Sequence, residues 1–126
     1  MYQNASATYQ AVERETVPGR ETEARVLTEA ALKLQACQKN WDSKDCESKL
    51  SEALRYNQKI WSIFQAELTR EDNPLPEQLQ KDLLRLSTFV DKRIFEIIAS
   101  PSLEKLDAVI NINRNIAAGL RQSPSI

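Results

Sequence analysis

Apolar residues recur at alternating intervals of three and four along four long stretches of this chain, and proline-containing or polar segments separate the stretches. That interval places the apolar side chains on one side of an α-helix. It predicts helices over residues 18–39, 44–70, 76–99 and 101–118. Because the connections are short, successive helices are expected to run antiparallel. The sequence therefore predicts an all-α fold, an antiparallel bundle of four long helices in a single domain over residues 1–126.

Residues near the ends of these stretches suit helix boundaries. Pro18, Pro76 and Pro101 each fit the first position of a helix, where a missing N–H removes no hydrogen bond. Either Asp42 or Ser43 is expected to cap the second long helix, because a short polar side chain can accept from the free N–H groups of the first turn.

The two ends of the chain follow different patterns. Residues 1–16 carry apolar side chains at helical spacing, which predicts a short additional N-terminal helix that either packs on the bundle or stays available to a partner. The side chains on that face are Tyr2, Ala5, Tyr9 and Val12. Gly119 is expected to end the last long helix in a left-handed conformation, which leaves residues 121–126 as a frayed tail.

The charge balance narrows the classes of partner. The chain has 17 Lys and Arg residues and 18 Asp and Glu residues, for a net charge of -1. Nucleic acid binding needs a surplus of basic side chains on one face, so this balance disfavours RNA or DNA as a partner. No segment is typical of a signal peptide and no apolar run approaches a membrane span, so we expect a cytoplasmic protein with no membrane partner.

Catalysis and metal binding lack their usual residues. The chain has no histidine, which removes the commonest general base and the commonest metal ligand. Its serines and cysteines have no adjacent base, and no glycine-rich loop could hold a phosphate. Carboxylate pairs such as Glu67 and Glu71 fit a solvated helix surface better than a catalytic dyad. We therefore expect no catalytic residues, no metal site and no cofactor, and we do not expect an enzyme.

The two cysteines, Cys37 and Cys46, flank the turn predicted between the first two long helices. A disulfide between them is geometrically possible. Two thiols without a histidine cannot form a standard zinc site. Because a cytosolic protein keeps such thiols reduced, we expect two free, structural cysteines.

Two asparagines interrupt the apolar stripes. Asn57 lies on the stripe of the second long helix, and Asn113 lies on the stripe of the fourth. A buried amide without a partner costs about 1–3 kcal/mol. Either the amides bond to backbone, water or each other in the core, which is the favoured interpretation, or they line a groove and bond to a partner. A direct bond between them would cross the bundle diagonally and would need a thin centre, with small residues such as Ala31 or Ala117, or a bridging water.

Trp61 and Phe64 share the stripe of Asn57 and have the same two interpretations. Ordinary core aromatics are favoured by burial preference. The alternative places them in a binding groove, where tryptophan is enriched among the residues that contribute most to affinity.

Five segments occur in a recognisable order: "MYQNASATY", "PGRETEARVLTEAALKL", "ALRYNQKIWSIFQAEL", "NPLPEQLQKDLLRLSTFV" and "LDAVININRNIAAGL". Together they resemble the FlaF family, the flagellar biosynthesis regulatory proteins of alphaproteobacteria, over nearly the whole chain. The most specific parts are Asn57 with Trp61, the turn over residues 73–76, and the ending from Asn113 to Leu120. The positions that match the family pattern are Asn57, Trp61, Pro74, Pro76, Asn113, Gly119 and Leu120.

The resemblance implies a small cytoplasmic protein that binds flagellin as its secretion chaperone and supports flagellin production, often alongside a separate translational regulator. It brings no catalytic residues, and Cys37 and Cys46 fall outside the pattern. Free flagellin has disordered terminal segments, which can fold as amphipathic helices when they bind an apolar helical groove. The residues expected to bind the partner are Asn57, Trp61, Phe64, Phe89, Phe95 and Asn113. The alternative is a regulator that acts on flagellin messenger RNA, directly or through a partner protein.

Overall fold

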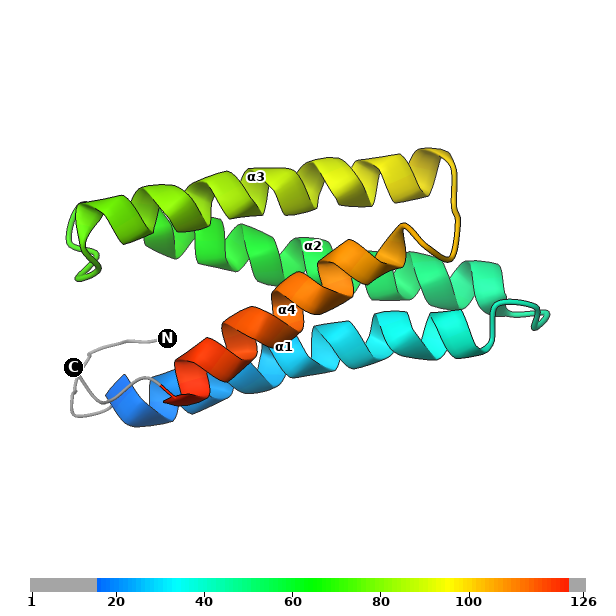
Figure 1. Ribbon diagram of the computed structural model, residues 1–126, viewed down its shortest axis with the longest axis horizontal. Coiled ribbons are helices and arrows are strands. Elements are labelled where there is room, and N and C mark those ends of the chain that lie inside the picture. The colour runs from blue at the N-terminus through cyan, green and yellow to red at the C-terminus, as the bar shows by residue number, and fades with distance from the viewer. Residues whose placement is uncertain (1–15, 123–126) are drawn as a thin grey trace.

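The computed structural model describes the backbone of residues 16–122 and the side chains of residues 20–122. Four α-helices make up this part of the chain, which contains no strand (Figure 1). They are α1 (Thr16–Lys39), α2 (Cys46–Leu68), α3 (Glu77–Ala99) and α4 (Leu106–Gln122). The all-α fold with four long helices is thus confirmed. The short N-terminal helix expected over residues 1–16 lies outside the described residues, except for Thr16, which opens α1.

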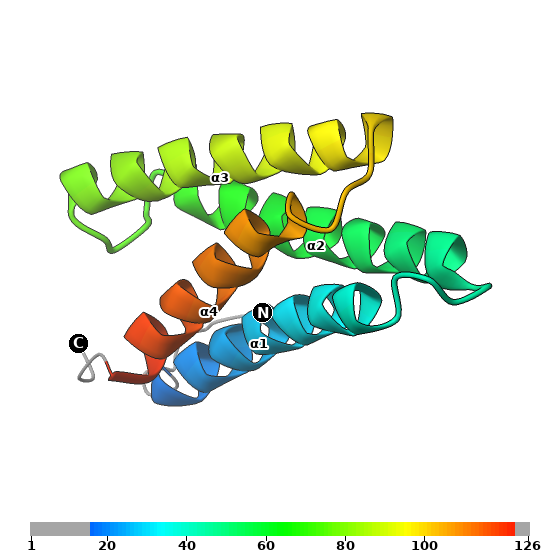
Figure 2. The same ribbon diagram turned by 45° about the vertical axis from the view of Figure 1, so that its right-hand side comes forward.

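The helices do not pack equally closely. α1 makes its most extensive contact with α4, the α1–α2 and α2–α3 contacts are smaller, and the α3–α4 contact is the smallest. No Cα atoms of α2 and α4 come within 8 Å of each other, so these two helices lie diagonally across the bundle. Figures 1 and 2 show α3 beside α2, while α4 starts near the end of α3 and descends along α1.

Polar side chains hold α4 against α1. The Gln38 side chain donates to the Asp107 carboxylate over 2.8 Å. Arg114 donates to the side chain of Gln35. Near the other end of α4, Arg121 donates to the Thr28 hydroxyl over 3.1 Å. Because these bonds are spaced along both helices, they fix the register of the α1–α4 pair.

The ends of α4 differ from the expectation. The helix starts at Leu106, because the segment after Pro101 forms turns in which Lys105 N donates to Ser102 O over 3.2 Å. At the other end α4 continues to Gln122, so Gly119 is an interior residue rather than a left-handed cap. Arg121 explains the extension, since its contacts with α1 hold the last turn in place.

The prediction that Asp42 or Ser43 caps α2 is also wrong. The residue before α2 is Asp45, and no side chain caps the helix. Ser43 donates its hydroxyl to the Asp45 carboxylate over 2.8 Å, which directs it away from the helix N–H groups. Asp42 lies in the turn that ends before α2.

The turn between α2 and α3 follows the predicted break at Pro74 and Pro76. Asn73 organises it, since its side-chain amide donates to Glu67 O over 2.8 Å and its carbonyl oxygen accepts from Leu75 N over 3.0 Å. Pro76 directly precedes α3, one position earlier than the first helical turn, and its carbonyl oxygen accepts from Gln80 N over 3.0 Å.

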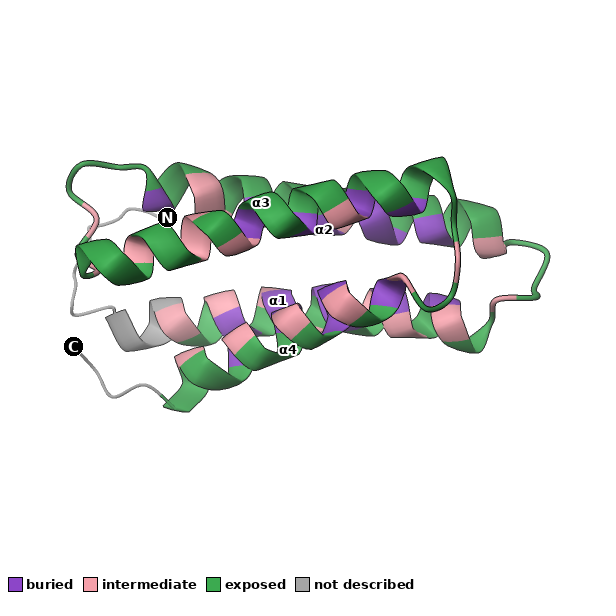
Figure 3. Ribbon diagram, turned by 45° about the horizontal axis from the view of Figure 1, so that its top comes forward, coloured by how far each residue is buried: buried purple, intermediate pink, exposed green. Residues whose placement is uncertain are grey.

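The core is tighter at one end of the bundle than at the other. In α3, Val90, Ile94 and Ile97 are fully buried, whereas Leu79, on the same stripe about three to five turns earlier, is 43% exposed. In α4 the stripe begins with the fully buried Leu106 and ends with half-buried side chains. Figure 3 shows the buried residues of α3 gathered in its C-terminal half. We call the loose end the open end and define it by Leu79, Leu83, Ile116 and Leu120.

Candidate functional site

A network of side-chain amides crosses the centre of the bundle. The Trp61 indole donates its Nε1–H to the Asn113 Oδ1 atom over 2.9 Å. Asn113 in turn donates from Nδ2 to the Asn57 Oδ1 atom over 2.7 Å. Asn57 donates from its own Nδ2 to the carbonyl oxygens of Ala53, at 2.9 Å, and of Ala30, at 3.2 Å. The amide network therefore links α1, α2 and α4.

Small residues make this diagonal contact possible. Ala30, Ala31, Ala53 and Ala117 are all buried with at most 2% exposure, so little side-chain volume fills the centre between the helices. The predicted direct bond between Asn57 and Asn113 is confirmed, and it needs no bridging water. Trp61 as the third member was not anticipated from its position on the stripe.

The burial of Asn57, Asn113 and Trp61 distinguishes between the two interpretations of these residues, a place in the core or a place in a binding groove. Asn57 and Asn113 are 0% exposed and Trp61 is 2% exposed. Their amide and indole groups are bonded inside the bundle, so the structure favours the core interpretation over the groove interpretation. Phe64 supports Trp61 through an edge-to-face contact with ring centroids 5.8 Å apart, and it is half-buried.

The remaining residues expected to bind a partner are on the surface of α3. Phe95 is 72% exposed and Phe89 is 41% exposed. Phe95 follows Phe89 by six positions, which places the two rings on different flanks of the helix. Phe89 lies under the Arg93 guanidinium, whose carbon is 5.5 Å from the ring centroid. Phe95 shares its flank with Ile98, which is 52% exposed, one turn further along. Ile98 was recognisable from sequence as lying outside the core stripe.

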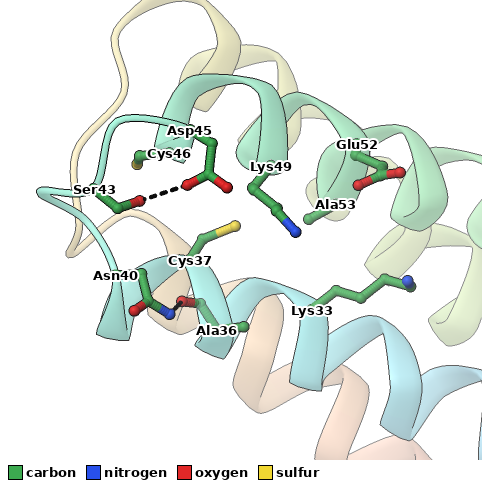
Figure 4. Close-up of a pocket in the computed structure, with 10 residues that line it drawn as sticks. All are labelled: Lys33, Ala36, Cys37, Asn40, Ser43, Asp45, Cys46, Lys49, Glu52 and Ala53. Atoms are coloured by element: carbon green, nitrogen blue, oxygen red, sulfur yellow. Dashed lines mark hydrogen bonds between the residues drawn. The ribbon is translucent and has the colours of Figure 1, made fainter.

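A hollow lies beside the turn between α1 and α2, lined by side chains from both helices (Figure 4). Cys37 and Cys46 line it, and both are free thiols, as expected. Burial raises the pKa of the Cys37 thiol, the nearby Cys46 raises it further and Lys49 lowers it. A raised pKa reduces the thiolate fraction, so Cys37 is a poor nucleophile at neutral pH.

Glu23, near the start of α1 at the opposite end of the bundle from this hollow, has a perturbed carboxyl group. Burial raises the pKa of Glu23, Arg20 opposes that shift and Glu67 adds to it. Over residues 20–122 no group of three or more Cys, Asp or Glu side chains could hold a metal ion. Among the helices described, none is long and apolar enough to cross a membrane.

The comparison with protein families identifies one relationship. The family described as "Flagellar protein FlaF" matches residues 5–120. No curated protein matches the chain. No solved structure matches it either.

Proposed function

The chain belongs to the FlaF family of flagellar proteins, and from this premise we propose that it is a flagellin-binding secretion chaperone that also regulates flagellin production. It works in the cytoplasm, without a cofactor and without enzymatic activity. The family match supports a role in flagellum biogenesis, and the surface of α3 supports binding as the way in which that role is performed.

The exposed apolar side chains of α3 carry the proposal. Four of the seven large apolar side chains that are exposed among the described residues lie on this one helix. They are Leu79, Phe89, Phe95 and Ile98. Of these, Phe95 and Ile98 lie next to each other on one flank, and adjacent exposed apolar side chains on the surface of a small protein commonly mark a contact with another protein. Exposed aromatic rings are suitable anchors, since aromatic residues are enriched in interfaces.

Flagellin suits this surface by its chemistry. Terminal segments of free flagellin that lack a fixed fold can form amphipathic helices when they bind, and their apolar side would pack on α3. The Phe95–Ile98 flank offers the most exposed ring of the helix as an anchor. By covering an apolar segment of flagellin in the cytoplasm, the protein would keep it from associating before export.

Calorimetry of the full chain with the flagellin of the same cell tests the proposal. We expect saturable binding with a negative heat-capacity change, because apolar surface is buried on binding. Absence of binding at concentrations on the order of tens of micromolar would contradict the proposal. Salt-sensitive binding to flagellin messenger RNA, without binding to flagellin, would instead support the alternative of a regulator that acts on the message.

A further inference from the structure

The surface that α2 and α3 share has an uneven distribution of charge. Its apolar centre lies on the Phe95–Ile98 flank, and exposed cations border it. We propose that this surface binds an amphipathic helix that lies across α2 and α3 and carries carboxylate side chains beside its apolar ones. The inference rests on the proposed function and specifies which kind of flagellin segment is bound.

The bond between Gln65 and Asp91 places one row of α2 beside one row of α3. The Gln65 side-chain amide donates to the Asp91 carboxylate over 2.8 Å. Because the two helices run antiparallel, the turn before Gln65 and the turn after Asp91 extend toward the same end of the bundle (Figure 1). Residues three or four apart share a side of a helix. The α2–α3 face defined in this way consists of Gln58, Ser62 and Gln65 on α2 and of Asp91, Phe95 and Ile98 on α3.

The centre of the α2–α3 face has the composition of an interface centre. Asp91 is its one ionisable residue, and the Asp91 carboxylate is already bonded to Gln65. Phe95 and Ile98 supply a largely exposed apolar area. Centres of protein interfaces are depleted in charged residues and enriched in aromatic ones. The apolar side of a partner can therefore pack here without burying an unpaired charge.

The opposite flank of α3 differs because its charges pair within the helix. The Arg85 Nη1 atom lies 3.8 Å from the Asp82 carboxylate. The Arg93 Nε atom lies 3.7 Å from the Glu96 carboxylate, and the Arg93 guanidinium covers the Phe89 ring. An aromatic ring covered by a paired cation is less available to a partner. The Phe95 side of α3 is therefore the better docking surface.

Three exposed cations border the α2–α3 face. Arg55, Lys59 and Lys92 each precede a member of the face by three positions, which makes them its neighbours on the helix surface. No hydrogen bond or salt bridge joins any of the three to another described residue. They are therefore free to pair with a partner.

Acidic side chains of the protein do not compensate this border. Asp91 and Glu96, the acidic neighbours of Lys92 along α3, already have partners. Glu52, the acid that precedes Arg55 by three positions, lines the hollow on the side of α2 that faces α1. The face and its border together carry three cations against one anion. A partner with carboxylates complements this charge, and such complementarity favours association and selects among partners.

A helix suits the surface better than an extended segment. An extended peptide binds by adding a strand to the edge of a sheet, and residues 16–122 contain no strand. An amphipathic helix instead presents apolar residues at intervals of three and four. Those residues would pack on Phe95 and Ile98, while carboxylates on the flanks of the helix would reach the border cations.

Calorimetry with the flagellin of the same cell tests the inference through two matched triple variants. One reverses the border and combines Arg55→Glu, Lys59→Glu and Lys92→Glu. The other reverses three exposed cations of α1 and the following turn, with the same change in net charge, and combines Arg25→Glu, Lys39→Glu and Lys44→Glu. At low salt we expect the border variant to bind about tenfold or more weakly than the parent protein, and the control to stay within about threefold. The difference should shrink as salt is raised, because salt screens exposed charges.

Ser62 tests whether the partner also contacts α2. Ser62→Asp and Ser62→Lys place opposite charges at the same exposed position. An acidic partner should bind Ser62→Asp about threefold or more weakly than Ser62→Lys. Equal affinities within either pair of variants would overturn the inference, while binding of flagellin by the parent protein would leave the proposed function intact. Absence of flagellin binding by the parent protein would contradict the proposed function and the inference with it.

Discussion

Asn113 donates its side-chain amide to Asn57 over 2.7 Å, and this bond joins two helices whose backbones do not touch. The same Asn113 accepts from the Trp61 indole on its other side. Each buried member therefore depends on its neighbour for a partner. The amide network fixes how α4 is placed against α2, because a shift of either helix along its axis would break both bonds.

Replacing Asn113 with leucine should destabilise the bundle by about 1–3 kcal/mol, because it leaves the Trp61 indole and the Asn57 carbonyl oxygen unpaired in the core. Denaturant unfolding measures the loss. Asn115→Leu on the exposed side of α4 is the matched control and should have little effect. A double-mutant cycle with Asn57→Ala and Asn113→Ala should show a coupling of about 0.5–3 kcal/mol. Strict additivity of the two changes would argue against the network.

Gly119→Ala should stabilise the protein by about 0.5–1 kcal/mol, because alanine is the better residue in a helix interior. Nothing lies within 4 Å of a Cβ atom added at this position. Thermal unfolding measures the gain. A loss of stability would show that Gly119 adopts a left-handed conformation and ends α4, as the sequence alone suggested.

Glu23→Gln should stabilise the protein near neutral pH. Burial raises the folded-state pKa of this carboxyl group, so its ionised form is less favourable in the folded protein than in the unfolded chain. The resulting loss of stability is present above the folded pKa. It fades as the pH falls through that pKa and is absent below the ordinary value of 4.5. The advantage of the variant should therefore disappear in acid, as denaturant unfolding across pH can show. Exposed Glu52→Gln serves as the control, and a variant no more stable than that control would contradict the prediction.

Both thiols should react with a disulfide reagent without prior reduction. Cys46 should react first, because it is less buried and because burial raises the pKa of Cys37. Cys46→Ser should remove the fast phase, and Cys37→Ser should remove the slow one. Thiols that appear only after reduction would show that the two cysteines pair.

The period of the apolar residues was sufficient to predict the four helices, because a stripe that must be buried specifies a helix whatever it packs against. It also located the polar exceptions, Asn57 and Asn113, and their bond followed from the need of each amide for a partner. The part of Trp61 was not predictable in the same way. Whether the Trp61 indole reaches Asn113 depends on the distance between α2 and α4, and the pattern of apolar residues along the sequence does not contain that distance.

Helix ends were less predictable, since local contacts decide them. Pro101 suits a first turn, yet the chain after it forms turns and α4 starts only at Leu106. Gly119 suits a helix end, yet the bond from Arg121 to Thr28 extends α4 beyond it. The difference in burial between the two ends of the bundle was not predictable either. Leu79 and Ile97 are both large apolar residues on the same stripe of α3, and they differ only in the side chains that surround them in the fold.

The central claim is that flagellin binds the apolar surface of α3. Its most direct test is calorimetry of two variants with the flagellin of the same cell. Phe95→Asp changes a side chain on α3 that is 72% exposed, and Leu32→Asp makes a comparable change on α1, where Leu32 is 52% exposed. We expect Phe95→Asp to weaken binding by about tenfold or more and Leu32→Asp to leave the affinity within about twofold of the parent protein. Equal affinities for Phe95→Asp and the parent protein would contradict the claim.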